Sequence, residues 1–138
     1  MKSFALLLAT ILSGCATPYG SFGLRGGYFE SRVSEHLIKV NFSGNGNITA
    51  DRVQTYALYR CAEVSRDFKK PYFVIYDSLF AAALNTPSSQ PTVGTLAGKP
   101  MAFAFVSMED TYRSGAHDTN STLNELAPEV GRAASAGK

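Results

Sequence analysis

The feature that most constrains the fold of this chain is one amphipathic helix placed between segments that alternate as strands do. From Ala50 to about Phe68, apolar side chains recur at steps of four, four, three and four residues. Their positions are Val53, Ala57, Cys61, Val64 and Phe68. This spacing predicts a helix with one apolar face, which another element must cover. We expect Thr49 to cap its N-terminus and Lys69-Lys70-Pro71 to end it.

Four segments around this helix have the patterns of β-strands. Residues 28–33 and 37–42 alternate apolar and polar side chains around a polar link, which predicts a β-hairpin with one buried face. Residues 72–76 are apolar on both faces, which predicts a strand covered from both sides. In residues 101–108, Ala102 and Ala104 alternate with larger side chains, so a helix can approach closely. The order β-β-α-β-β predicts an α+β fold, with the helix on a four-stranded, largely antiparallel sheet.

The remaining segments predict less regular structure. Residues 16–27 are rich in Gly, Ser and Pro, the composition of a flexible tether. Residues 79–100 contain several Pro and Gly and predict a long excursion from the sheet. Residues 121–127 predict a short C-terminal helix stopped by Pro128, and residues 131–138 a disordered tail. We therefore expect one α+β domain over residues 28–130, preceded by a linking segment at 15–27.

Composition excludes several classes of protein. The chain has 138 residues, enough for one modest domain, and 45% of them are hydrophobic, which is too many for a disordered chain. The formal net charge is only +2 and no stretch gathers the basic residues, which argues against a nucleic-acid binder. The two His and the scattered carboxylates have no metal-ligand spacing, and the sequence indicates no cofactor.

The N-terminus has the pattern of a targeting segment. Met1-Lys2-Ser3 supplies a positive charge, and an apolar run of nine residues follows from Phe4 to Leu12. As a helix this run would be about 14 Å long, too short for the ~30 Å hydrocarbon core of a bilayer. The segment therefore predicts a secretory signal peptide and not a transmembrane anchor.

The apolar run ends in Leu12-Ser13-Gly14-Cys15, which resembles the bacterial lipobox. The resemblance implies removal of residues 1–14 by cleavage between Gly14 and Cys15, a diacylglycerol thioether on Cys15, and an acyl chain such as palmitate on the new amine. The mature protein would be bound to membrane lipid without spanning the membrane. An ordinary secretory signal, or an apolar N-terminal strand, is the alternative. Ala16 stands where inner-membrane lipoproteins carry Asp, so the analogy favours the periplasmic side of the outer membrane.

Several short segments together resemble a family of small uncharacterised envelope lipoproteins of Gram-negative bacteria. They are G-G-Y-F-E-S-R at 26–32, N-F-S-G-N-G at 41–46, Y-A-L-Y-R-C-A-E at 56–63 and Y-F-V-I-Y-D at 72–77. The resemblance covers about residues 26–77 and implies a lipid-anchored envelope protein, but no activity. Cys61 stands where the family commonly has Ala, which argues against a functional thiol.

Few residues are candidates for chemistry. Cys61 with His36 or His117 would supply a nucleophile and a base, but the helix spacing places Cys61 on the apolar face, where a thiol is buried and unreactive. Asp77 ends a buried strand, where hydrogen bonding at the strand end is commoner than a site role.

Two other features have ordinary structural interpretations. Gly44-Asn45-Gly46 lies between a strand and a helix, but it lacks the further Gly and the Lys of a phosphate-binding loop, so it predicts a tight turn. Tyr56 and Tyr59 are expected to pack at the edge of the core, with an interface role as the alternative.

Two functional hypotheses follow from these observations. The first is a membrane-anchored, non-enzymatic lipoprotein whose small domain binds or supports another envelope component. The second is a small periplasmic hydrolase or ligand-binding protein, with a pocket near residues 79–100 into which Asp77, His36 or His117 would converge.

Overall fold

The chain folds into an antiparallel sheet with two long helices on one face, the predicted α+β class. The structure, a computed structural model, describes the backbone of residues 16–136 and the side chains of residues 16–131. Its strands are β1 (Gly27–Arg32), β2 (Leu37–Ser43), β3 (Tyr72–Tyr76), β4 (Thr92–Leu96), β5 (Lys99–Glu109) and β6 (His117–Asp118). Its helices are α1 (Ala50–Asp67), α2 (Leu79–Ala83) and α3 (Thr119–Ala136).

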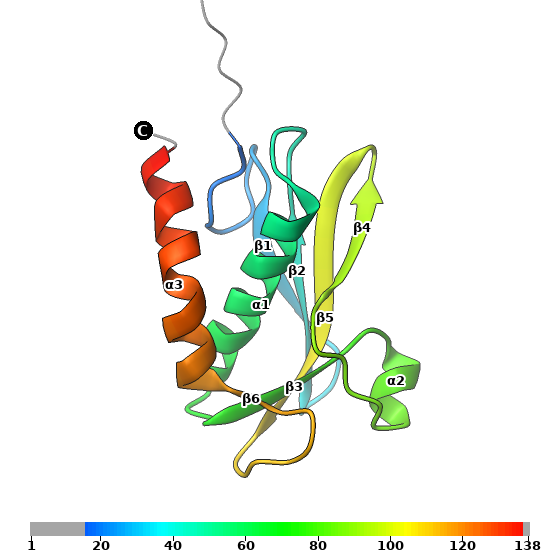
Figure 1. The fold of residues 1–138 in the computed structure, drawn as a ribbon. Coiled ribbons are helices and arrows are strands. Elements are labelled where there is room, and N and C mark those ends of the chain that lie inside the picture. The colour runs from blue at the N-terminus through cyan, green and yellow to red at the C-terminus, as the bar shows by residue number, and fades with distance from the viewer. Residues whose placement is uncertain (1–15, 137–138) are drawn as a thin grey trace, which may run out of the picture.

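The long strand β5 organises the sheet. The strand order is β1-β2-β5-β3-β6, every pairing is antiparallel, and β4 pairs with the first half of β5. β1 and β2 form the predicted hairpin, in which Glu30 pairs with Val40 and Val40 in turn with Ala104 of β5. Figure 1 shows α1 and α3 side by side over one face of this sheet.

α1 begins and ends where the sequence predicts. The Thr49 side chain accepts a hydrogen bond from the Arg52 N–H, and Phe68 is the C-cap. Val53, Ala57, Cys61 and Val64 are buried against the sheet, where Ala102 and Ala104 of β5 are also buried. The small side chains of β5 therefore face the helix, as expected. Phe68 departs from the predicted apolar face: it is 45% exposed because it lies past the last turn of the helix.

The opposite face of the sheet carries a smaller apolar cluster. Val74 and Tyr76 of β3 pack with Phe105, and Ala81 and Ala82 of α2 cover part of them. Phe73 and Ile75 of β3 belong to the core under α1. β3 is therefore covered on both sides, as its sequence predicts.

The sheet has six strands where the sequence predicts four, because residues 79–100 and 117–118 contain regular structure. Ser78 caps the one-turn helix α2, and its side chain accepts a hydrogen bond from the Ala81 N–H. β4 turns into β5 through Ala97 and Gly98, both with positive φ, the geometry of a two-residue hairpin loop. β4 contains Gly94, and β6 has only two residues, so neither has the alternation from which a strand is recognised.

The C-terminal helix is longer than predicted. α3 begins at Thr119 and continues through Pro128, and its backbone is helical to Ala136, where the sequence predicts an end at Pro128 and a disordered tail. Pro128 removes one helical N–H and is unfavourable at this position. Tertiary packing offsets that cost, because Leu123 and Val130 are both buried on the α1 side.

Residues 16–27 are packed on the domain instead of forming the expected flexible tether. Thr17 is buried, and its hydroxyl accepts a hydrogen bond of 2.7 Å from the Asn45 N–H. Gly27 is also buried, because the chain folds back on itself and its Cα lies too close to the carbonyl of Gly20 to admit a side chain. The folded domain therefore begins at the first described residues.

Tyr19 is the centre of this contact. Its ring lies 5.2 Å from the rings of Tyr28 and Tyr59 and 5.5 Å from that of Tyr56. Its hydroxyl donates to Glu63 of α1, and burial, followed by this hydrogen bond, raises the pKa of Tyr19. The tyrosine therefore joins the N-terminal segment to α1 through both apolar and polar contacts.

We predict that Tyr19→Ala lowers the free energy of unfolding by about 2–3 kcal/mol, because it removes an aromatic ring from this cluster. Tyr19→Phe retains the ring and should cost about 1 kcal/mol, the contribution of the hydrogen bond to Glu63. Denaturant unfolding of the purified protein measures both values. Tyr112→Ala is the matched control, since Tyr112 is 66% exposed. If residues 16–27 were a mobile tether, Tyr19→Ala would lower the free energy of unfolding as little as the control does.

Candidate functional site

Cys61 lies in the core and not at a site. It is fully buried between α1 and the sheet, and burial raises the pKa of its thiol. A thiol that stays protonated is neither a nucleophile nor an accessible modification site. His36, the first candidate base, lies in the β1–β2 link with its side chain 85% exposed, so the two are not brought together.

The contacts of His117 are those of a packed structural residue. Its ring stacks on Phe73 at 5.0 Å with the two planes 13° apart. It lines a hollow of about 350 Å³ with Tyr112 and Ser88. Burial lowers the pKa of His117, and a hydrogen bond with the Ser88 backbone partly opposes this shift. Burial therefore favours the neutral form of the imidazole.

The three polar candidates do not converge. His36 lines a different hollow, of about 360 Å³, together with Tyr76 and Leu79. Asp77 is exposed, and its carboxylate accepts a hydrogen bond of 3.0 Å from the Ser78 hydroxyl next to the start of α2. The described residues near 79–100 therefore form two separate hollows with one histidine in each, and these hollows do not bring the three candidates together.

The segment after β2 is a tight turn. A side chain at Gly44 would lie 2.3 Å from Ile48 Cγ2 and 2.8 Å from the Pro100 carbonyl. The Asn47 N–H donates to the Asn45 side chain at 2.9 Å, which closes the turn before α1. Close packing therefore explains the glycine at position 44.

Both tyrosines of α1 belong to the packing of the domain. Tyr56 is fully buried, with its ring 5.0 Å from that of Phe42 in an edge-to-face arrangement. Its hydroxyl is buried with no hydrogen-bond partner among the described residues. Tyr59 is half-buried and packs between the two clusters beneath α1. Tyr56 therefore lies deeper than the core-edge position that the sequence predicts.

A polar network underlies the hollow beside α2. The Arg113 guanidinium donates to the Tyr76 hydroxyl at 2.7 Å and to Glu109 at 2.9 Å, and it also donates to Asn85. The Ser107 hydroxyl donates to the same Glu109 carboxylate at 2.8 Å. Tyr76 and Ser107 of this network also line the hollow. No local sequence signal predicts the network, because its five residues come from three separate segments.

Exposed apolar side chains lie beside this hollow. Leu79, Phe80 and Leu84 on and just after α2 are 52%, 73% and 61% exposed. We call these three residues and the hollow the α2 surface. Contiguous exposed apolar side chains next to a depression are typical of binding surfaces, so this is the first candidate functional site.

The second candidate is the N-terminal attachment. Gly14 and Cys15, the predicted cleavage and lipidation residues, lie outside the described residues. Directly after them, Thr17 and Tyr19 fix the chain to the domain. The Gly-, Ser- and Pro-rich composition of residues 16–27 predicts a tether and not this contact. The aromatic side chain of Tyr19 was a signal that the segment could pack on the domain.

Comparisons leave the predicted family open. No family model, no curated protein and no solved structure matches the chain. Among the described residues, no helix is long and apolar enough to cross a membrane, and no three His, Cys, Asp or Glu side chains gather as metal ligands would.

The neutral state of His117 predicts a pH dependence of stability. Its pKa in the folded protein lies below the value of about 6.5 for the unfolded chain, so below that pH the unfolded chain binds the proton first. The contribution of His117 to stability is therefore full above about pH 6.5 and declines as the pH falls toward the lower folded pKa.

Denaturant unfolding of the protein and its His117→Gln variant at a series of pH values measures this effect. We expect the free energy of unfolding of the variant to fall less between about pH 6.5 and pH 5 than that of the wild-type protein, since this is the range in which an ordinary histidine titrates. His36→Gln is the control, because His36 is 85% exposed. Equal pH profiles for all three proteins would contradict the assignment.

Proposed function

We propose that this protein is a lipid-anchored, non-enzymatic binding or structural module of the bacterial cell envelope, with acylated Cys15 as its anchor. The observation that carries the proposal is the N-terminal attachment. Thr17 is buried two residues after Cys15, and Tyr19 bonds to Glu63 of α1. A lipid at Cys15 would therefore hold the whole domain at the membrane surface with no long spacer between them.

The placement of the α2 surface supports a binding role. In Figure 1, α2 lies at the opposite end of the sheet from the start of the described chain. A domain anchored through Cys15 would turn this surface away from the membrane. Leu79, Phe80 and Leu84 would then be presented to an apolar segment of another envelope protein.

The hollow beside α2 supports the second candidate, a small-ligand binding protein. Its volume of about 360 Å³ lies within the range of small-molecule pockets, and His36, Tyr76 and Ser107 offer polar groups at its wall. A hydrolase would need a base and a nucleophile within hydrogen-bond reach. Because His36 is separate from Cys61 and His117, the geometry gives the hydrolase hypothesis no support.

Lipidation is tested by growing bacteria that express the full chain with an alkyne fatty acid. We expect the wild-type protein to take up the label and to lose residues 1–14. Cys15→Ser should be neither labelled nor cleaved at Gly14, because the thiol is needed for the thioether. An unlabelled wild-type protein, or normal processing of Cys15→Ser, would refute the anchor.

Binding through the α2 surface is tested by photo-crosslinking in the same cells. A benzophenone amino acid in place of Phe80 should give one discrete adduct, because this side chain is 73% exposed on the distal end. The same probe in place of Glu125, exposed on α3, is the matched control. The same adducts from both positions, or none from Phe80, would remove the α2 surface as a docking site.

A further inference from the structure

The chain enters the domain beside a distinct surface. Thr17 is hydrogen-bonded to the backbone of Asn45, and its methyl group would lie 3.1 Å from a side chain at Gly26. Asn45 and Gly26 both line a hollow of about 220 Å³. Two peptide units separate Thr17 from Cys15, and an extended chain spans ~3.6 Å per residue. Covalent geometry therefore keeps the Cα of Cys15 within roughly 7 Å of the Thr17 Cα.

Two turns project on either side of this hollow, and each carries one leucine and one cation. In the first, Gly23 and Gly26 exchange two backbone hydrogen bonds of 2.9 and 3.0 Å, so Leu24 and Arg25 form its tip. In the second, Leu96 pairs with Lys99 across the β4–β5 turn. All four side chains line the hollow. We call the two turns and Phe22 the anchor-end surface.

The anchor-end surface exposes several large apolar side chains to solvent. Leu24 is fully exposed, Leu96 is 62% exposed, and Phe22 is 59% exposed, with its ring 5.4 Å from that of Phe29. Turn tips ordinarily carry polar residues, because they project into solvent. Leu24 is at the tip of one turn, and Leu96 directly precedes the two tip residues of the other. An exposed leucine at each of two neighbouring turns therefore indicates that something other than water meets them.

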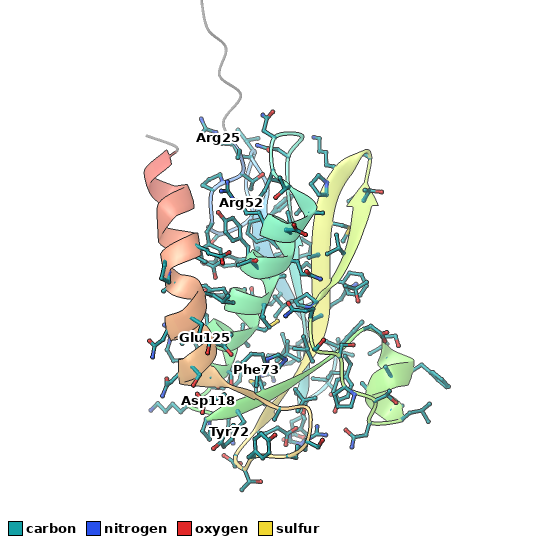
Figure 2. The ribbon with its side chains drawn as sticks, viewed as in Figure 1. Arg25, Arg52, Tyr72, Phe73, Asp118 and Glu125 are labelled. Carbon is teal, nitrogen blue, oxygen red and sulfur yellow. The ribbon has the colours of Figure 1, made fainter. Side chains whose placement is uncertain are left out.

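The charges at this end are cationic. Arg25 and Lys99 are exposed beside the two leucines, and Figure 2 shows Arg25 next to the point where the described chain begins. Asp51 and Arg52 in the first turn of α1 offset each other. Leucine and phenylalanine among arginine and lysine are typical of segments that lie in the interface of an anionic bilayer, where the cations meet phosphate groups.

We propose that the anchor-end surface inserts into the headgroup region of the membrane that holds Cys15, with Leu24 and Leu96 among the upper acyl chains and Arg25 and Lys99 at lipid phosphates. This inference rests on the proposed lipid anchor. One lipidated residue would permit many orientations of a domain, whereas exposed leucines at two neighbouring turns beside it would select one. The β4–β5 turn then faces the bilayer, and α2 lies at the end of the sheet away from it.

The test exploits the absence of tryptophan from the chain. Leu24→Trp, Leu96→Trp and Phe80→Trp each introduce a unique fluorophore, the last of them on the α2 surface as the matched control. The variants are expressed as full chains, and the lipidated mature proteins are reconstituted into phosphatidylcholine–phosphatidylglycerol vesicles, with and without bromine on the acyl chains. We expect bromine to lower the emission at positions 24 and 96 roughly twofold and to leave position 80 unchanged, because interfacial residues reach the acyl boundary.

Three outcomes would overturn the inference. Leu24→Trp quenched no more than Phe80→Trp would show that the tip does not reach the bilayer. Quenching at all three positions would show that the anchored domain has no preferred orientation. If a second copy of the chain covered position 24 instead of the bilayer, the protein would sediment as a dimer and bromine would not quench the emission at position 24. Alkyne labelling of Cys15 in the same samples separates these results from failure of the anchor itself.

Discussion

The close approach of α1 to β5 is the contact on which the rest of the structure depends. Ala102 and Ala104 are among the residues of β5 that face the helix, and both are buried. Their small side chains bring the α1 backbone near the sheet, and Val53, Ala57 and Cys61 fill the space between. Larger side chains there would separate the layers and create strain. α3, which packs on α1, and the N-terminal segment both use the surface that this approach creates.

The second determinant is the half-buried ion network along the outer side of α1. Arg60 bonds to Glu63 at 2.9 Å and to Glu30 of β1, and its guanidinium lies 4.0 Å over the ring of Tyr28. Glu63 also accepts the Tyr19 hydroxyl. Arg60 and Glu63 of α1 thus together join an edge strand to the segment that follows Cys15. Removing one of these charges would leave its partners half-buried and unpaired, which destabilises a fold.

How much of this could be predicted depends on whether a signal is local. The α1 spacing, its Thr49 cap and the alternation of β2 and β5 are periodic, so they fixed the fold class. β4 has Gly94 at its centre, and Pro128 breaks the α3 pattern, so in both cases long-range packing overrode the local preference. The packed segment 16–27 was hidden for the same reason: its conformation is set by Tyr19 meeting residues of β1, β2 and α1.

The sequence predicts a pocket near residues 79–100, but it does not predict the hollows themselves, because each is assembled from distant segments. β5 relates the two candidate surfaces in space. Its Lys99 end carries the anchor-end surface, and Phe105 packs beneath α2. Six residues of strand separate these positions, roughly 20 Å at the usual rise. A rigid strand makes that separation a fixed property of the domain. An anchored protein of this construction would therefore hold the α2 surface at a set height above the bilayer, where a soluble domain on a long tether would sample many heights.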